Sequence, residues 1–308
     1  MRALVLGARG AVGRVVTQEL RRRGHTVTPA GRAGGTDSVA IDLASPAGLS
    51  TLAERAPSHD VVINASGIEA PAIAEAAGGT ILIDISATAS YLDNLAHVSP
   101  VGQPLVLGAG LVPGLSTIML SSLDSRPGDD LDLAVVLGGG EQHGTAAVDW
   151  TANLAGHPLF APPEGGTVLN FREGRRLPGP SGERRHLRAD FPDHLLIGTP
   201  HGLSVRTYLA TDSRISTAAL GIVGRLPRLR GLVRHAPHLG GAGWSLTALN
   251  RRTGQKISAR GEGQSLATGI LTAQIAEAAS RLAPSTAVTA ADLLTLDDIR
   301  ILEGMHVH

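Results

Sequence analysis

Three glycines near the start of the chain have the spacing of a phosphate-binding turn. Gly7, Gly10 and Gly13 follow a short apolar run at residues 3–6, typical of a buried strand, and precede a stretch with helical spacing. At such a turn, backbone N–H groups at the start of the helix can hold a dinucleotide pyrophosphate. A tight turn that binds nothing is the alternative. The segment therefore predicts a dinucleotide site whose contacts are Gly7, Arg9, Gly10, Ala11, Val12 and Gly13.

Two arginines indicate which dinucleotide the site takes. The second predicted strand, residues 25–30, ends at Gly31 and Arg32, where an NAD-binding domain carries an acid for the adenosine ribose hydroxyls. Arg9 lies inside the glycine turn. Two guanidinium groups suit the 2′-phosphate of NADP, because their planar forks match phosphate oxygens. The sequence thus favours NADP over NAD, with Arg32 as a solvated loop cation as the alternative.

Further cofactor contacts are expected where later strands end, because ligands of parallel sheets bind at the carboxyl ends of the strands. Asp42 ends the third predicted strand and could accept a hydrogen bond from the adenine amino group. Turns of small residues after the fourth and sixth predicted strands would border the ribose and the nicotinamide. Their expected contacts are Asn64, Ala65, Ser66, Gly67, Gly110, Pro113 and Gly114.

Few side chains are suited to the proton transfer that accompanies hydride transfer. The cofactor brings the hydride, so the protein has to supply orientation, a proton and exclusion of water. His143, in a glycine-rich loop, is the first candidate for the proton donor, with an ordinary exposed histidine as the alternative. Asp84 and Tyr91, near the end of the fifth predicted strand, could take the same role. Three more residues could anchor a substrate carboxylate or simply lie on the surface: Arg172, Arg206 and Tyr208.

Several mechanisms are excluded by residues that the chain lacks. It has no cysteine, so thiolate nucleophiles and disulfides are absent. Lys256 is the only lysine, and neither tyrosine has a lysine four residues later, which excludes the Tyr-x-x-x-Lys pair of short-chain dehydrogenases. The histidines lack the spacing of a metal site, so no metal is expected.

The elements that must position these residues fall into two groups. Strands and helices alternate through the first half of the chain, which predicts a Rossmann-type doubly wound parallel α/β sheet. Later strands alternate apolar and polar residues, which indicates an inserted α+β domain for substrate binding and dimerisation. An apolar helix at residues 266–282 suits the first sheet. We expect a dinucleotide domain of residues 1–125 and 266–308, a substrate domain of residues 126–265, and a loop over the cleft at residues 173–190.

Composition limits the class of protein further. The chain has 308 residues, of which 43% are hydrophobic, and a net charge of zero gives no sign of a nucleic-acid surface. No apolar run has the length of a membrane span, and the first residues lead into the glycine turn rather than forming a signal peptide. We expect a cytoplasmic homodimer that acts on a small molecule, with neither nucleic acid nor membrane as a partner.

Four segments together resemble the saccharopine dehydrogenase-like reductases. They are VLGARGAVGR, AGR after the second predicted strand, LIDIS in the fifth and GAGLVPGLS after the sixth. The resemblance covers about the first 120 residues and returns in the helix that begins near Leu266. Val112 departs from the family pattern, in which an aspartate often precedes the proline of the last turn.

The resemblance implies an NADP-dependent oxidoreductase that transfers a hydride to an imine or an amino-acid-derived substrate, with specialised metabolism as one setting. Some relatives reduce C=C bonds, so an NADP-dependent enoyl reductase is an alternative. A protein of another class, a non-catalytic NADP-binding regulator, is also open. The large second domain favours the enzyme.

Overall fold

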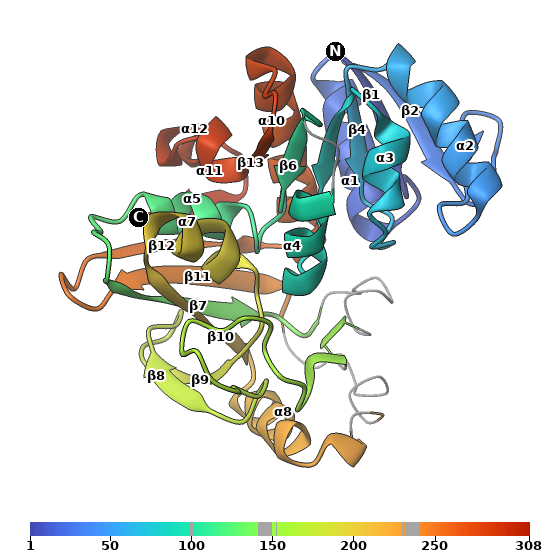
Figure 1. Cartoon of the computed structure of the whole chain (residues 1–308). Coiled ribbons are helices and arrows are strands. Elements are labelled where there is room, and N and C mark those ends of the chain that lie inside the picture. Colours follow the sequence, from blue (N-terminus) through green and yellow to red (C-terminus); the bar gives the residue numbers. More distant parts are fainter. Residues whose placement is uncertain (99–101, 141–149, 152, 230, 232–240) are drawn as a thin grey trace. The chain divides into compact units, whose positions relative to one another are not determined.

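The chain forms two compact units, which Figure 1 shows in sequence colours. A computed structural model describes residues 1–98, 102–140, 150–151, 153–229, 231 and 241–308. The first unit contains Met1–Leu115 and Ser265–Thr295, and the second contains Ser116–Gln264 and Leu296–His308. None of the helices in the described ranges combines the length and the apolar character needed to cross a membrane.

The first unit is built on a seven-stranded sheet in which all strands are parallel. The central strands are almost entirely apolar and buried, as expected for a parallel sheet covered on both faces. The Rossmann-like fold that the sequence predicts is therefore confirmed. In spatial order the strands are β13 (Ala287–Thr289), β6 (Leu105–Leu107), β5 (Ile81–Asp84), β4 (Val61–Asn64), β1 (Arg2–Leu6), β2 (Thr26–Gly31) and β3 (Val39–Ala40).

Helices cover this sheet, and local sequence signals set where they begin. Ser45 caps α2 by accepting a hydrogen bond from the Gly48 amide at 3.1 Å, with Pro46 in the first turn. The Thr289 amide donates to Asp292 Oδ2 at 2.7 Å, a capping-box contact at the start of a short helix. The helices of the unit are α1 (Ala11–Arg22), α2 (Pro46–Arg55), η1 (Ala56–Ser58), α3 (Ala72–Ala77), α4 (Ala89–Val98), α10 (Gln264–Leu282) and α11 (Ala290–Leu293).

Helix α10 returns to the first unit after the long insertion and packs on α1. Gly269 makes this contact possible, because a Cβ atom there would lie 2.5 Å from Val15 Cβ. Arg23, after the end of α1, donates to Glu277 at 2.6 Å, and His25 pairs with the same carboxylate. Thr272 donates to the Ala109 carbonyl at 2.8 Å, which ties the helix to the turn after β6.

The second unit is built on a mixed seven-stranded sheet. Its long strands β7 and β10 are parallel to each other, and the other described pairings are antiparallel. In spatial order the strands are β14 (Met305–Val307), β12 (Lys256–Glu262), β11 (Gly243–Asn250), β7 (Asp130–Leu137), β10 (Ser204–Thr211), β9 (Arg184–Arg188) and β8 (Gly174–Leu177). Its helices are α5 (Leu115–Ser121), η2 (His194–Gly198), α7 (Thr199–His201), α8 (Arg214–Arg225), η3 (Pro227–Leu229) and α12 (Leu296–Arg300).

Two sequence-based expectations differ from the structure. The segment at residues 173–190 contains the antiparallel pair β8–β9 and is not a loop, because Leu177 and Leu187 are buried while three arginines of the two strands are exposed. The boundaries also differ: residues 116–125 and 296–308 belong to the second unit. The tail lies there because β14 pairs with β12, whereas β13 completes the first sheet.

Candidate functional site

The glycine turn after β1 packs directly against the turn after β4. Gly7 has φ +75°, and a Cβ atom there would lie 2.5 Å from the Ala65 oxygen and from Ser66 Cα. A Cβ atom at Gly13 would lie 2.2 Å from the Gly7 oxygen. Both positions therefore require glycine. A side chain at Gly7 would push the two turns apart, and one at Gly13 would push the start of α1 away from the glycine turn.

Helix α1 starts in this turn with its positive end uncapped by side chains. Gly10 is its N-cap, and no side chain of the described residues bonds to the first turn of the helix. The Gly10 amide donates to the Gly7 oxygen at 2.9 Å, which closes the turn. The amides of Ala11, Val12 and Gly13 stand in the first helical turn, where they favour an anion.

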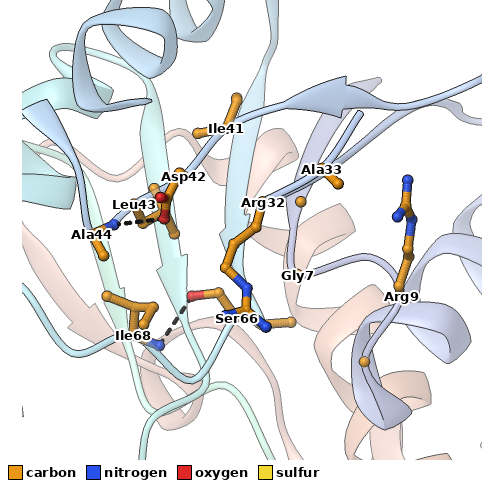
Figure 2. Close-up of a pocket in the computed structure, with 13 residues that line it drawn as sticks. Gly7, Arg9, Arg32, Ala33, Ile41, Asp42, Leu43, Ala44, Ser66 and Ile68 are labelled. Atoms are coloured by element: carbon orange, nitrogen blue, oxygen red, sulfur yellow. Dashed lines mark hydrogen bonds between the residues drawn. The ribbon is translucent and has the colours of Figure 1, made fainter. Parts of the chain in front are cut away.

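A cleft of about 710 Å³ opens between these turns and the ends of β2 and β3. It brings together seven residues that the sequence singles out, namely Gly7, Arg9, Gly10, Arg32, Asp42, Ala65 and Ser66 (Figure 2). It also contains neighbours that sequence reasoning missed, namely Gly31, Ala33, Ile41, Leu43, Ala44 and Ile68. These neighbours flank predicted contacts, so extending each predicted turn by two residues would have found them. Predicted contacts that do not line the cleft are Ala11, Val12, Gly13, Asn64, Gly67, Gly110, Pro113 and Gly114.

The two arginines of the cleft differ in the hydrogen bonds of their side chains. Arg9 Nη2 donates to the Gly34 oxygen at 2.9 Å and to Ser38 Oγ at 3.0 Å, so it ties down the loop after β2. Arg32 is exposed, and within the described ranges we find no hydrogen bond or ion pair of its side chain. Figure 2 shows Arg32 extending from the end of β2 into the cleft. Of the two, Arg32 has the guanidinium available to a ligand.

Asp84 and Tyr91, predicted as proton donors, contact each other inside the unit. The Tyr91 hydroxyl donates to Asp84 Oδ2 at 3.0 Å, and the Ser86 amide donates to Oδ1 at 2.8 Å. Burial raises the pKa of the Asp84 carboxyl, while burial and the Asp84 charge raise the pKa of the Tyr91 hydroxyl. Neither side chain lines the cleft, so their arrangement favours a supporting role, and proton donation by either one stays a prediction.

The remaining predicted positions are His143 and the turn at residues 110–114. His143 lies outside the described residues. Gly114 is required within its own turn, because a Cβ atom there would lie 1.9 Å from the Gly110 oxygen. The Gly110 amide also donates to the Pro113 oxygen at 2.9 Å, which makes this turn compact.

The predicted carboxylate anchors of the second unit are engaged with other groups. Arg206 pairs with Asp130 and, at 2.9 Å, with Glu164. Tyr208 is buried, and the Arg188 guanidinium stands 5.7 Å from its ring centroid. Arg172 donates to the Gly224 oxygen at 3.4 Å. These contacts join the three residues to other groups of the second unit, and carboxylate binding by any of them stays a prediction.

Comparison with known proteins identifies the fold. No family model matches the chain, and no curated protein is significantly similar to it in sequence. A mutant of meso-diaminopimelate dehydrogenase from Clostridium tetani, solved with DAP, has a TM-score of 0.51 at 13% identity, covering 98% of this chain and 96% of that one. The shared fold is established. A 3-alpha-hydroxysteroid dehydrogenase from Pseudomonas, complexed with NADH, covers 29% of this chain and 46% of its own at 19% identity, and its TM-score of 0.24 carries no argument.

Proposed function

We propose that this protein is an NADP-dependent oxidoreductase that transfers a hydride to an imine or an amino-acid-derived substrate. The observation that carries the choice of cofactor is the composition of the cleft, and the substrate class rests on the resemblance to the saccharopine dehydrogenase-like reductases. The floor of the cleft is formed by turns in which Gly7 and Gly13 leave no room for a side chain. Its wall at the end of β2 presents the exposed guanidinium of Arg32 where an NAD-specific site needs an acid.

The residues of the cleft fit a dinucleotide in a consistent order. The pyrophosphate would lie on the amides at the start of α1, which carry no competing side-chain cap. Arg32 would hold the 2′-phosphate, and Arg9 would keep the loop at Gly34 and Ser38 in place beside it. Asp42, whose Oδ1 accepts from the Ala44 amide at 3.2 Å, would face the adenine.

The chain's own contribution to the reaction is binding, orientation and exclusion of water. When bound, NADPH supplies the hydride. The turn at Ala65 and Ser66 borders the cleft beyond the glycine turn and would orient the ribose next to the nicotinamide. His143 is the proposed proton donor, with Asp84 and Tyr91 as the other candidates.

Cofactor binding tests the proposal directly. We expect tight NADPH binding by fluorescence titration and weaker binding of NADH. Arg32→Ala should weaken NADPH binding by about 1.5–3 kcal/mol, the range for a hydrogen bond to a charged group, and leave NADH binding unchanged. Arg21→Ala is the matched control, because it removes the same charge from an exposed position at the far end of α1. Equal affinities for the two cofactors, or tighter NADH binding, would contradict the choice of NADP.

The reaction class is tested by substrate panels with NADPH in excess. We expect consumption of NADPH with cyclic imines or with mixtures of a 2-oxo acid and an amine, which condense to an imine with loss of water. By mass spectrometry the product should be two hydrogens heavier than the imine. Consumption only with conjugated alkenes would instead identify an enoyl reductase. Binding of NADPH without turnover of any panel would indicate a non-catalytic regulator.

A further inference from the structure

A continuous chain of buried polar side chains connects α4 to the edge of the cleft. The Tyr91 hydroxyl donates to Asp84 Oδ2 at 3.0 Å, and Asn64 Nδ2 donates to the same oxygen at 2.8 Å. Ser66 Oγ donates to Asn64 Oδ1 at 2.6 Å and accepts from the Ile68 amide at 3.1 Å. Asn64 Nδ2 also donates to the Ile68 oxygen at 3.1 Å. Ser66 and Ile68 line the cleft, so the network ends at the ligand surface.

Three side chains of the network are buried. Exposed fractions are 0% for Asp84, 1% for Asn64 and 7% for Tyr91. Buried polar groups cost stability unless they are fully hydrogen-bonded, and even a satisfied network adds little to stability over apolar side chains of the same shape. Such a network instead specifies one geometry for the groups that it joins.

The geometry that it specifies is that of the turn at residues 64–68. The Ser66 hydroxyl donates one hydrogen bond and accepts another within the turn, and both bonds stabilise the conformation of the turn. The same turn rests on Gly7, whose missing Cβ would be 2.5 Å from the Ala65 oxygen. A shift of this turn would therefore change its contact with the glycine turn, which forms the floor of the cleft.

We propose that Tyr91, Asp84 and Asn64 are positioning residues that set the dinucleotide affinity of the cleft by holding the turn at residues 64–68 against the glycine turn. This inference rests on the proposed function, because it takes the cleft to bind a dinucleotide. In this role Asp84 and Tyr91 act through Asn64, which requires no contact with the reacting atoms.

Asn64→Asp is the sharpest test, because it keeps the shape of the side chain and replaces a donor facing Asp84 with a second carboxyl. Burial raises the pKa of the Asp84 carboxyl, so ionisation of the second carboxyl beside it with rising pH should add repulsion and displace the turn. We expect the NADPH dissociation constant of the variant to exceed that of wild type about tenfold at pH 9, and the ratio to be smaller at pH 6, where a proton held between the two carboxyls favours a hydrogen bond.

The other titratable groups near this pair are Tyr91 and Glu69. The Glu69 residue is exposed as a whole, but desolvation of its carboxyl and the Asp84 charge raise its pKa. Both groups are present in the variant and in the wild type, and the ratio of the two proteins at each pH removes their contribution. The same ratio removes the titration of the cofactor phosphate.

Two further variants keep the inference testable if Asn64→Asp does not fold. Tyr91→Phe removes one hydrogen bond to Asp84 and should weaken NADPH binding about threefold at every pH. Gln103→Met is the matched control, because it removes a buried hydrogen bond to the Thr80 oxygen near the amino ends of β5 and β6, away from the cleft, and should leave affinity unchanged.

The outcomes separate this inference from the proposed function. A wild-type protein that binds neither NADPH nor NADH would overturn the proposed function. Wild-type binding with equal affinity in Asn64→Asp at both pH values, or in Tyr91→Phe, would overturn the positioning role alone. Equal weakening in Gln103→Met would also overturn it, because the effect would then reflect general loss of packing.

Discussion

The two sheets of this protein keep their polar side chains in different places. In the first sheet the central strands are apolar along their length, and polar side chains stand at their ends, as Asn64 and Asp84 do. In the second sheet charged residues stand within the strands, where Asp132 on β7 is 1% exposed and Arg188 on β9 is 2% exposed. Each is held by partners on neighbouring elements.

This difference follows from what covers each sheet. Helices lie on both faces of a doubly wound parallel sheet, so a polar group is tolerated only where the strands end. That is also the edge at which ligands bind. In the mixed sheet, by contrast, one face carries a network of ion pairs that includes Asp130, Asp132, Arg206 and Arg251. We therefore expect mutations in the first sheet's turns to affect ligand binding, and mutations in this network to affect stability alone.

The largest effect is expected where the start of α1 packs on the glycine turn of the first unit. In Gly13→Ala the new Cβ would lie 2.2 Å from the Gly7 oxygen, which forces the turn open. Binding of NADPH should be lost, and the free energy of unfolding should fall by about 3 kcal/mol. Calorimetry and cofactor titration measure the two quantities. Gly79→Ala, where a Cβ meets nothing within 4 Å, should change neither. Normal NADPH binding by Gly13→Ala would remove the turn from the site.

The second prediction concerns the ion pairs of the second unit. Asp132 accepts from Arg251 at 2.6 and 2.9 Å, and Arg175 lies 3.3 Å away. Asp132→Asn removes the buried charge that both arginines contact, leaves Arg251 paired with Asp130 at 3.9 Å, and should lower the free energy of unfolding by about 3 kcal/mol. Urea unfolding measures the change.

The comparison predicts that cofactor affinity does not change in Asp132→Asn. Asp297→Asn, which breaks an ion pair with Arg300 in which the aspartate is 84% exposed, should cost less than about 0.5 kcal/mol. Weaker NADPH binding in Asp132→Asn would show that the polar face contributes to the dinucleotide site.

A third prediction uses the pH dependence of the second unit. Asp193 is fully buried and accepts from Ser116 Oγ at 2.7 Å, and burial raises the pKa of its carboxyl to about 7. The folded protein therefore keeps a proton that the unfolded chain releases near pH 4. The protonated Asp193 carboxyl therefore contributes stability that is present below about pH 4 and is lost as pH rises to about 7.

Thermal unfolding between pH 4 and pH 8 measures this loss, which we expect to be about 2 kcal/mol in the wild type. Asp193→Asn keeps the acceptor for Ser116 and cannot ionise, so its unfolding should lack that part of the pH dependence. Identical pH profiles for variant and wild type would contradict the raised pKa.

The smallest effect is expected at the surface of the first unit, and it has the opposite sign. Hydrogen bonds from Arg22 and Arg23 lower the pKa of Glu19 to about 2. Its contribution is present above about pH 4.5 and is lost as pH falls toward 2. Glu19→Gln should reduce the acid-induced loss of stability by about 1 kcal/mol, with the exposed Glu54→Gln as a control. An unchanged acid profile would show that these surface contacts contribute nothing.

Several elements could be predicted from sequence because their signals are local. The strand at residues 3–6, the glycine turn and helix α1 stand within one short segment, and the Ser45 cap is read from adjacent residues. The hairpin of β11 and β12 likewise follows from two alternating strands and a short turn. In contrast, the β8–β9 pair was missed because its arginines made the segment appear uniformly polar.

Pairings between distant segments could not be predicted in the same way. Asn64 and Asp84 are partners in the register of β4 and β5, and each is the last residue of its strand. Two consecutive apolar strands that end in a polar residue are a signal that could have joined them. The hydrogen bond of Tyr91 to Asp84 depends on how α4 packs, which local sequence patterns do not indicate.

The sequence by itself determined the alternation of strands and helices, the glycine turn and the presence of Arg9 and Arg32 near one another. These follow from periodicity and backbone sterics, which act over a few residues. Only the tertiary structure decided that Arg9 is engaged while Arg32 is available, and that Asp84 faces Asn64 rather than the cleft. It also decided that residues 296–308 belong to the second unit. Such outcomes depend on register and packing between segments far apart in the chain, where the burial of polar groups selects one arrangement.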